Sequence, residues 1–257
     1  MALTLYLHPL ASFCHKVLIA LYENGTPFRP QVVDLGDPAS AAAVLDRWPV
    51  GKIPVLADEA RGVTLPETSI IIEYLDTHYP GPVRMLPDDP AAALEVRLWD
   101  RFFDLYVSAP MQKIVLDRIR PEDGRDPLGV AQARATLDTA YAMIDGQLSA
   151  QPWAAGDSFT LADCAAAPAL FFASIVHPIP EAHASAHAFL DRLLARRSFA
   201  RVLAEQGADL VLAARRVEKL EETAGAVRAL GRDAVVVPMD VADHASVEAA
   251  FERMPAL

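Results

Sequence analysis

The sequence predicts an α/β domain, then an all-helical domain, then a shorter stretch in which strands and helices alternate again. Three observations support this order. Short apolar runs alternate with helical patterns over residues 1–80, helical periodicity alone fills 88–204, and strand patterns return over 205–257. A chain of 257 residues is long enough for at least two compact domains. We therefore treat these three ranges as separate units.

The first part of the α/β unit has the pattern strand, helix, strand. Residues 3–7 alternate as a strand would and end at His8-Pro9, while 13–22 place apolar side chains on one helical stripe. Residues 31–35 form a second apolar strand pattern. Two strands joined by a helix predict a right-handed parallel βαβ unit.

The second part of this unit has the pattern of a hairpin and a helix. Residues 53–57 and 63–65 are short apolar runs on either side of a turn that contains Arg61-Gly62. A helix is expected to begin at Glu67. Four prolines between residues 80 and 90 then exclude a helix or a central strand, so this segment is the expected linker.

The middle unit is expected to be entirely helical. Its clearest apolar stripe consists of Leu137, Tyr141, Ile144 and Leu148. Thr160 and Asp163 have the spacing of a capping box, which predicts that a helix begins there. A further helix is expected over 186–203.

The last unit combines a strand pattern at 208–214 with a helix at 217–230, and a strand at 234–238 with a helix at 244–254. This is a partial βαβα arrangement.

Charge and composition exclude several functions. A formal net charge of -11 disfavours nucleic-acid binding, which depends on Lys and Arg. The sequence shows neither a signal-peptide pattern nor an apolar run of membrane-spanning length, so we expect a soluble cytoplasmic protein without membrane contact. Cys14 and Cys164 are the two cysteines, and their separation predicts neither a metal site nor a disulfide.

Four motifs in order resemble the glutathione S-transferase family. They are residues 5–23, 49–56, Glu67-Thr68 and 159–163. The resemblance implies a thioredoxin-like glutathione-binding domain over 1–80 and an all-helical transferase domain over 88–204. It also implies a homodimeric detoxification enzyme that conjugates the thiolate of glutathione, its co-substrate, to an electrophilic small molecule.

Such an enzyme must stabilise a thiolate, because a thiol with a pKa near 8.5 is mostly protonated at neutral pH. A hydroxyl at a helix N-terminus provides this stabilisation. Serine-type relatives place their hydroxyl at the position of Ala11, so we expect the adjacent Ser12 to be the catalytic residue and a glutathione contact. Three alternatives stay open: Cys14 or a backbone group faces the sulfur, or Ser12 only caps the helix.

By the same resemblance, the other glutathione contacts come from two segments. Pro54 is expected to be a cis-proline that presents the backbone of Ile53 to the cysteinyl part of glutathione. Glu67 and Thr68, at a helix start, are expected to hold the γ-glutamyl end, and Lys52 the glycyl carboxylate. The alternatives are an edge-strand proline, a capped helix and a surface lysine.

An aromatic group at Trp99, Phe102, Phe103 and Tyr106 has helical spacing. This pattern is more typical of a core or a subunit interface than of a substrate pocket.

Residues 201–257 resemble an internal piece of a short-chain dehydrogenase/reductase, which implies a Rossmann-like partial fold. Arg215-Arg216 resemble that family's 2′-phosphate selectors, and Asp240-Val241 its adenine contacts. The glycine-rich loop and a Tyr-x-x-x-Lys motif are missing, so we expect no NADP binding. The extension is either a functional module or a gene-fusion remnant. Alternatives for the whole chain are a non-conjugating glutathione-binding or glutathione-dependent redox protein and, more remotely, an NADP-binding fusion.

Overall fold

The computed structural model describes residues 2–207, 210–214, 217–229, 231–239 and 246. The chain divides into two compact units, Met1–Leu190 and Asp191–Leu257.

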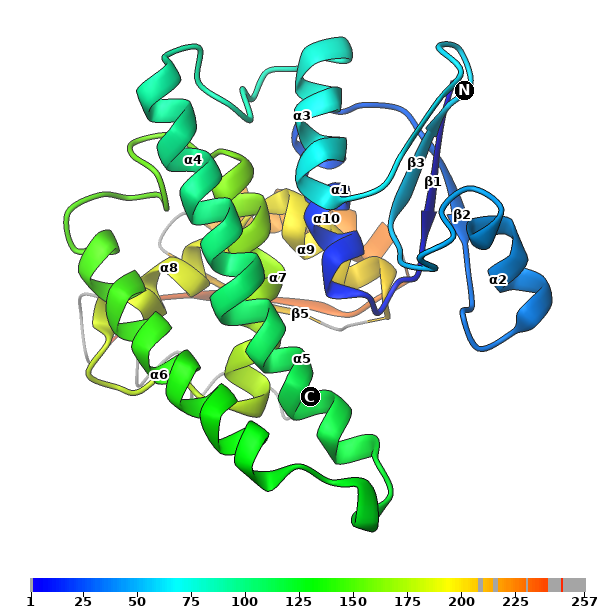
Figure 1. The fold of residues 1–257 in the computed structure, drawn as a ribbon. Helices are drawn as coiled ribbons and strands as arrows, with labels where there is room; N and C mark the ends of the chain where they lie inside the picture. Colours follow the sequence, from blue (N-terminus) through cyan, green and yellow to red (C-terminus); the bar gives the residue numbers. More distant parts are fainter. Residues whose placement is uncertain (1, 208–209, 215–216, 230, 240–245, 247–257) are drawn as a thin grey trace. The chain divides into compact units, whose positions relative to one another are not determined.

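A four-stranded sheet in the order β2-β1-β3-β4 forms the N-terminal part of the first unit (Figure 1). The strands are β1 (Leu3–Leu7), β2 (Arg29–Val32), β3 (Val55–Asp58) and β4 (Val63–Leu65). β1 and β2 are parallel, whereas β3 is antiparallel to both β1 and β4. The expected βαβ unit and hairpin are confirmed. β2 ends at Val32 instead of residue 35, because its partner β1 ends at Leu7.

Helices cover both faces of this sheet. α1 (Ser12–Glu23) and α3 (Thr68–His78) lie on one face, and α2 (Pro38–Leu45) lies on the other (Figure 1). Tyr6 and Val55 pack with Val44 of α2. The sequence analysis missed α2, although Asp37 caps it by accepting hydrogen bonds from two backbone N–H groups of its first turn.

The rest of the first unit is helical, as expected. Its long helices are α4 (Pro90–Phe102), α5 (Ala109–Ile119), α6 (Pro127–Leu148), α7 (Leu161–Val176) and α8 (Ala184–Leu194), with a short 3-10 turn at Glu122–Gly124. α7 is largely buried and contacts α1, α4 and α5. The capping box at its start is confirmed, since Asp163 Oδ2 accepts the backbone N–H of Thr160 at 2.8 Å.

A π-helical turn at Phe103–Ser108 joins α4 to α5. The physical cause is Pro110, which has no N–H to donate and whose ring crowds the carbonyl four residues earlier. The backbone N–H of Ala109 accordingly donates to the carbonyl of Asp104, five residues back. The sequence analysis expected plain helix here. Such turns often occur at functional sites.

A buried ion cluster links the thioredoxin-like part to the helical part. Lys16 of α1 is almost fully buried, and its Nζ lies 2.6 Å from Asp100 Oδ1 and 2.9 Å from Asp104 Oδ2. It also donates to Ser69 Oγ of α3, and this hydroxyl donates to Asp100 Oδ2 at 2.6 Å. Burial raises the pKa of Asp104, while the charge of Lys16 opposes that rise.

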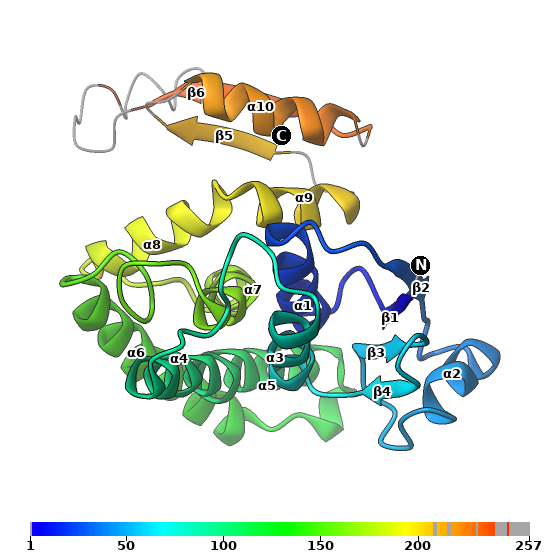
Figure 2. The ribbon, with the colours of Figure 1, turned by 90° about the horizontal axis from the view of Figure 1, so that it is seen from above.

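The second unit contains α9 (Arg197–Glu205), β5 (Leu210–Ala214), α10 (Val217–Ala229) and β6 (Ala234–Pro238). β5 and β6 are parallel neighbours, and α10 connects them (Figure 2). Leu212, Leu220, Val227 and Ala234 form its core together with Ala204 of α9. The expected motif residues 215–216 and 240–241 and the helix at 244–254 lie outside the described residues, except for Ser246.

The single helix expected over 186–203 is wrong, because the chain is extended at Arg196 between α8 and α9. In a continuous helix, the side chains at positions 196 and 197 would lie on the same buried face as Leu193. Both positions are arginines, and burying an unpaired guanidinium is costly. The break lets Arg197 begin a new helix with its own buried face.

We expect the variant Lys16→Met to lower the free energy of unfolding by about 3–5 kcal/mol, because it leaves two buried carboxylates without their cation. Urea unfolding followed by circular dichroism measures this. Adding Asp100→Asn and Asp104→Asn should recover part of the loss. Lys113→Met, at a partly exposed ion pair with Asp126, is the control and should cost less than about 1 kcal/mol. An unchanged unfolding midpoint for Lys16→Met would refute a stabilising role for the cluster.

Candidate functional site

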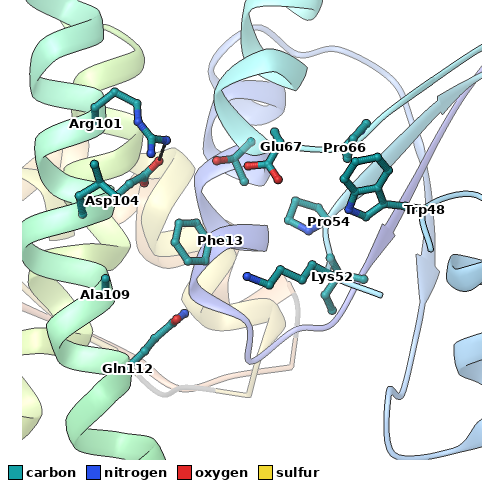
Figure 3. A pocket seen from close by; sticks show the side chains of 13 residues that line it. Phe13, Trp48, Lys52, Pro54, Pro66, Glu67, Arg101, Asp104, Ala109 and Gln112 are labelled. Carbon is teal, nitrogen blue, oxygen red and sulfur yellow. Dashed lines mark hydrogen bonds and ion pairs between the residues drawn. The ribbon is translucent and has the colours of Figure 1, made fainter. Parts of the chain in front are cut away.

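A cavity of about 240 Å³ lies between the thioredoxin-like part and the helical part of the first unit (Figure 3). One wall comes from the segment before β3 and from the start of α3. The opposite wall comes from the π-helical turn and its neighbours. The lining residues are Phe13, Trp48, Lys52, Ile53, Pro54, Pro66, Glu67, Thr68, Arg101, Asp104, Leu105, Ala109 and Gln112. Five of the six residues expected from the sequence therefore meet in one place.

The wall before β3 has the expected backbone geometry. The peptide bond between Ile53 and Pro54 is cis. β3 begins only at Val55, so no strand of the described sheet pairs with Ile53. The backbone of Ile53 therefore borders the cavity without a ladder partner, which is the arrangement needed to pair with an extended peptide.

Glu67 has an unusual conformation at the start of α3. Its φ of 66° lies in the left-handed region, which is unfavourable for a residue other than glycine. Glu67 occupies the N-cap position, yet its side chain does not cap the helix, and Figure 3 shows its carboxylate directed into the cavity. The first N–H of this helix with a backbone partner belongs to Ile71, so the preceding N–H groups can bind an anion.

Charged groups of both signs line the cavity. Lys52 extends into it from one wall, and Arg101 lies on the other, where it donates to Asp104 Oδ2 at 3.3 Å (Figure 3). Glu67 and Asp104 supply negative charge. A peptide ligand of a few residues that carries carboxylates and an ammonium group matches this distribution of charge.

A second cavity of about 480 Å³ shares Phe13, Lys52, Ile53 and Gln112 with the first. Apolar side chains form most of its remaining wall. Ser12, the first residue of α1, lines this cavity and not the first one. The first backbone N–H of α1 with a partner is that of Cys14, which donates to the Ala11 carbonyl at 2.8 Å. The free N–H groups at Ser12 and Phe13 thus add positive potential beside the hydroxyl.

Cys14 does not reach either cavity. Its side chain is 0% exposed, and burial raises the pKa of its thiol to about 12, despite an opposing hydrogen bond from the backbone. Reactive cysteines are partly exposed and have a lowered pKa. The alternative in which Cys14 faces the sulfur of glutathione is therefore disfavoured.

The lining residues that sequence reasoning missed include Trp48, Arg101, Asp104 and Gln112. Arg101 and Asp104 lie within the aromatic group at 99–106, and Gln112 follows it. The apolar pattern of these segments indicates that one face is buried, but it does not indicate which part of the protein covers that face. The interpretation of this group as core holds for Trp99, Phe102 and Phe103, which are buried and contact one another. Tyr106 is exposed, and none of the four lines either cavity.

The described residues hold no group of three or more His, Cys, Asp or Glu side chains that could bind a metal ion. Among the helices described, none has both the length and the apolar character that crossing a membrane requires.

Comparison with protein families matches three models to this chain. The model "Glutathione S-transferase, N-terminal domain" matches residues 5–83, and "Glutathione S-transferase, C-terminal domain" matches residues 127–192. The model "short chain dehydrogenase" matches residues 197–256. With the relatives below, these matches show that the chain belongs to the glutathione S-transferase family and continues into a dehydrogenase-like segment.

Relatives include proteins with and without a transferase name. The glutathione S-transferase-like protein LUC7 of a Fusarium species is 33% identical over 165 residues, which cover 62% of this chain and 71% of that protein. A stringent starvation protein A homolog of Coxiella burnetii is 30% identical over 210 residues, which cover 81% of this chain and 94% of that protein.

Solved structures show the same fold. A glutathione S-transferase of Methylobacillus flagellatus with glutathione bound has a TM-score of 0.71 at 25% identity, covering 78% of this chain and 98% of that one. A glutathione S-transferase of Methylobacterium radiotolerans in complex with glutathione sulfonate has a TM-score of 0.68 at 31% identity, covering 77% and 92%.

We expect Cys14 and Cys164 to stay unmodified when the native protein is treated with a disulfide reagent at pH 8, because both side chains are buried. A thiol whose pKa is raised to about 12 stays protonated at that pH, so reactivity should increase only on unfolding. Mass spectrometry of native and urea-unfolded samples measures this. A native mixed disulfide between Cys14 and glutathione would reverse our assignment.

Proposed function

We propose that this protein is a glutathione transferase that joins the thiolate of glutathione to an electrophilic small molecule. The observation that carries the proposal is the pair of adjoining cavities. The first is the more polar of the two and its lining includes Lys52, Glu67 and Thr68, whereas the second is mostly apolar and its lining includes Ser12. A reaction between a charged tripeptide and an apolar molecule needs two such compartments with a shared boundary.

Glutathione would lie along the first cavity with its glycyl end at Lys52 and its γ-glutamyl end at the N-terminus of α3. Lys52 would bind the glycyl carboxylate, and the backbone of Ile53 would pair with the cysteinyl residue. The N-terminus of α3 would bind the γ-glutamyl carboxylate, while Glu67 would receive the ammonium group. The Arg101–Asp104 pair on the opposite wall supplies complementary charge at the same end.

The sulfur of glutathione would then lie at the boundary between the cavities. Ser12 is the residue we assign to its activation. In the described part of the chain its hydroxyl makes no hydrogen bond, so it is available as a donor. A hydroxyl donor and the N-terminus of α1 both favour the thiolate over the thiol, which lowers the pKa of glutathione's sulfur.

A second candidate function is glutathione binding without conjugation. Ala11 stands where serine-type relatives carry their hydroxyl, and one relative is a stringent starvation protein A homolog. Retention on a glutathione-affinity column without any turnover of model electrophiles would favour this second function.

We expect Ser12→Ala to lower kcat/KM for conjugation at least tenfold, which corresponds to about 1.4 kcal/mol of lost transition-state stabilisation, with little change in glutathione affinity. Glu67→Ala should mainly weaken glutathione binding, because it removes the partner of the ammonium group. Steady-state kinetics and calorimetry separate the two effects.

Ser149→Ala and Glu122→Ala alter exposed residues outside both cavities and serve as matched controls. Unchanged turnover in Ser12→Ala would move the activating role to the backbone of α1. Identical defects in Ser12→Ala and Glu67→Ala would contradict the division of roles.

We also propose that the protein is a homodimer. Ile70 of α3 is 51% exposed, and Leu94 and Leu98 of α4 are 68% and 64% exposed. Arg97 of α4 links the two helices, because it donates two hydrogen bonds of 2.9 Å to Glu73 of α3. An exposed apolar group on two fixed helices is a suitable subunit interface.

We expect the wild type to sediment as a dimer and Leu98→Arg to sediment near the chain mass of 27.8 kDa, since a charge at the centre of the interface would be buried without a partner. Leu128→Arg alters an equally exposed leucine of α6 and is the control. Wild-type protein that sediments as a monomer rules the dimer out.

A further inference from the structure

We propose that His15 is a positioning residue: its ring holds the Pro9 carbonyl and thereby sets the direction in which the N-terminus of α1 presents Ser12 to the sulfur of glutathione. The inference rests on the proposed transferase function and adds to it a buried side chain that lines neither cavity. It starts from a hydrogen bond between α1 and the loop at residues 8–11, which connects β1 to α1.

The ring of His15 is fixed on the side of the loop and on the side of α7. His15 Nε2 lies 2.7 Å from the carbonyl oxygen of Pro9, six residues earlier. A carbonyl oxygen can only accept a hydrogen bond, so Nε2 carries a proton and donates it. The ring also packs against Phe172 of α7, with 5.3 Å between the ring centroids, and α7 contacts α1 along its length (Figure 2). A ring held in this way keeps the Pro9 carbonyl in one place.

His15 is an uncharged donor at neutral and alkaline pH. Burial lowers the pKa of its imidazole to about 4, while the hydrogen bond to Pro9 opposes this fall. A histidine with a lowered pKa is neutral at every pH above that value. The hydrogen bond to Pro9 therefore does not change in the pH range in which the thiol of glutathione titrates.

A second buried side chain of the same helical turn holds the beginning of the loop. Cys14 is fully buried, and the hydrogen bond that opposes the rise in the pKa of its thiol comes from the backbone of His8. The backbone N–H of Ala11 donates to the His8 carbonyl at 3.0 Å. Two adjacent residues of α1 thus hold two adjacent residues of the loop.

The loop leads directly into the proposed activating group. Leu10, Ala11 and Ser12 follow Pro9, and all three line the second cavity. Ala11 is the extended N-cap residue and Ser12 is the first residue of the helix, so the place where the chain leaves Pro9 decides how both are directed. A hydrogen bond weakens steeply when its angle is poor. A small rotation of this loop would therefore reduce the stabilisation of a thiolate.

The test uses the full-length protein and three substitutions of His15. His15→Leu keeps the bulk of the side chain and removes the donor. The amide nitrogen of glutamine is as many bonds from Cα as Nε2 is, whereas that of asparagine is one bond closer, so His15→Gln can reach Pro9 and His15→Asn cannot. Ile19→Ala removes buried packing one turn further along α1, at a residue that lines neither cavity, and is the control for destabilisation. Circular dichroism establishes that each variant is folded.

The readout is the pKa of the thiol of bound glutathione, measured by the ultraviolet absorbance of the thiolate. We expect His15→Leu and His15→Asn to raise this pKa by about one unit. Their kcat/KM for benzyl bromide at saturating glutathione should fall about tenfold at a pH below this pKa, where the thiolate fraction limits the rate, and should approach the wild-type value above it. His15→Gln should stay within about twofold of the wild type at every pH. Ile19→Ala should keep the wild-type pH profile.

The outcomes separate this inference from the proposed function. A loss in His15→Leu that is the same at every pH, the same change of profile in Ile19→Ala, or a His15→Gln as defective as His15→Asn would overturn the role of His15. So would unchanged profiles in His15→Leu and His15→Asn. If the wild type binds glutathione without conjugating benzyl bromide, the proposed conjugation is contradicted, and the thiolate absorbance alone decides the role of His15. Wild-type protein that leaves the thiol pKa at its value in free glutathione overturns both.

Discussion

The buried cluster around Lys16 is the interaction on which the proposed site depends. Lys16 lies on α1, four residues after Ser12, and its partner Ser69 lies directly after Thr68 on α3. Asp100 and Asp104 come from the opposite side of the cavity. One cation therefore fixes the distance between the walls, and Asp104 belongs to both the cluster and the cavity lining. Because breaking a buried pair costs more than an exposed one, this distance is firmly held.

Pro110 adds a second constraint to the same wall. The π-helical turn that it causes inserts an extra residue into the turn between α4 and α5. Residues before the turn and residues after it thereby meet one cavity, since Asp104 precedes Gln112 by eight positions and both line it. In an unbroken helix, eight positions correspond to about 800° of rotation, which would leave the two side chains about 80° apart around the helix axis. The π-helical turn changes this angle, and with it the side chains that line the cavity.

The wall of the site formed by the segment before β3 and the start of α3 could be predicted from the sequence, and the wall formed by α4, the π-helical turn and α5 could not. Pro54 and Glu67-Thr68 could be predicted because the motifs that contain them resemble those of the glutathione S-transferase family. Arg101 and Gln112 lie outside these motifs, and their position depends on how α4 and α5 pack against α1 and α3. The break at Arg196 shows the same limit in the second unit: the spacing of apolar residues favoured one helix, and the cost of burying arginines ended it.

The one-residue offset between Ala11 and Ser12 has a geometric consequence for the proposed reaction. Ala11 is the N-cap of α1 and has an extended backbone, so a hydroxyl at Ser12, the first helical residue, points differently from one at Ala11, although both residues line the second cavity. In this protein Ser12 lines the second cavity alone, Pro54, Glu67 and Thr68 line the first cavity alone, and Ile53 lines both. Ser12 would therefore approach the sulfur from the side of the electrophile. A hydrogen bond from that side must stabilise the thiolate while leaving a path for the attacking carbon, and the shared boundary at Phe13 and Gln112 is where both requirements meet.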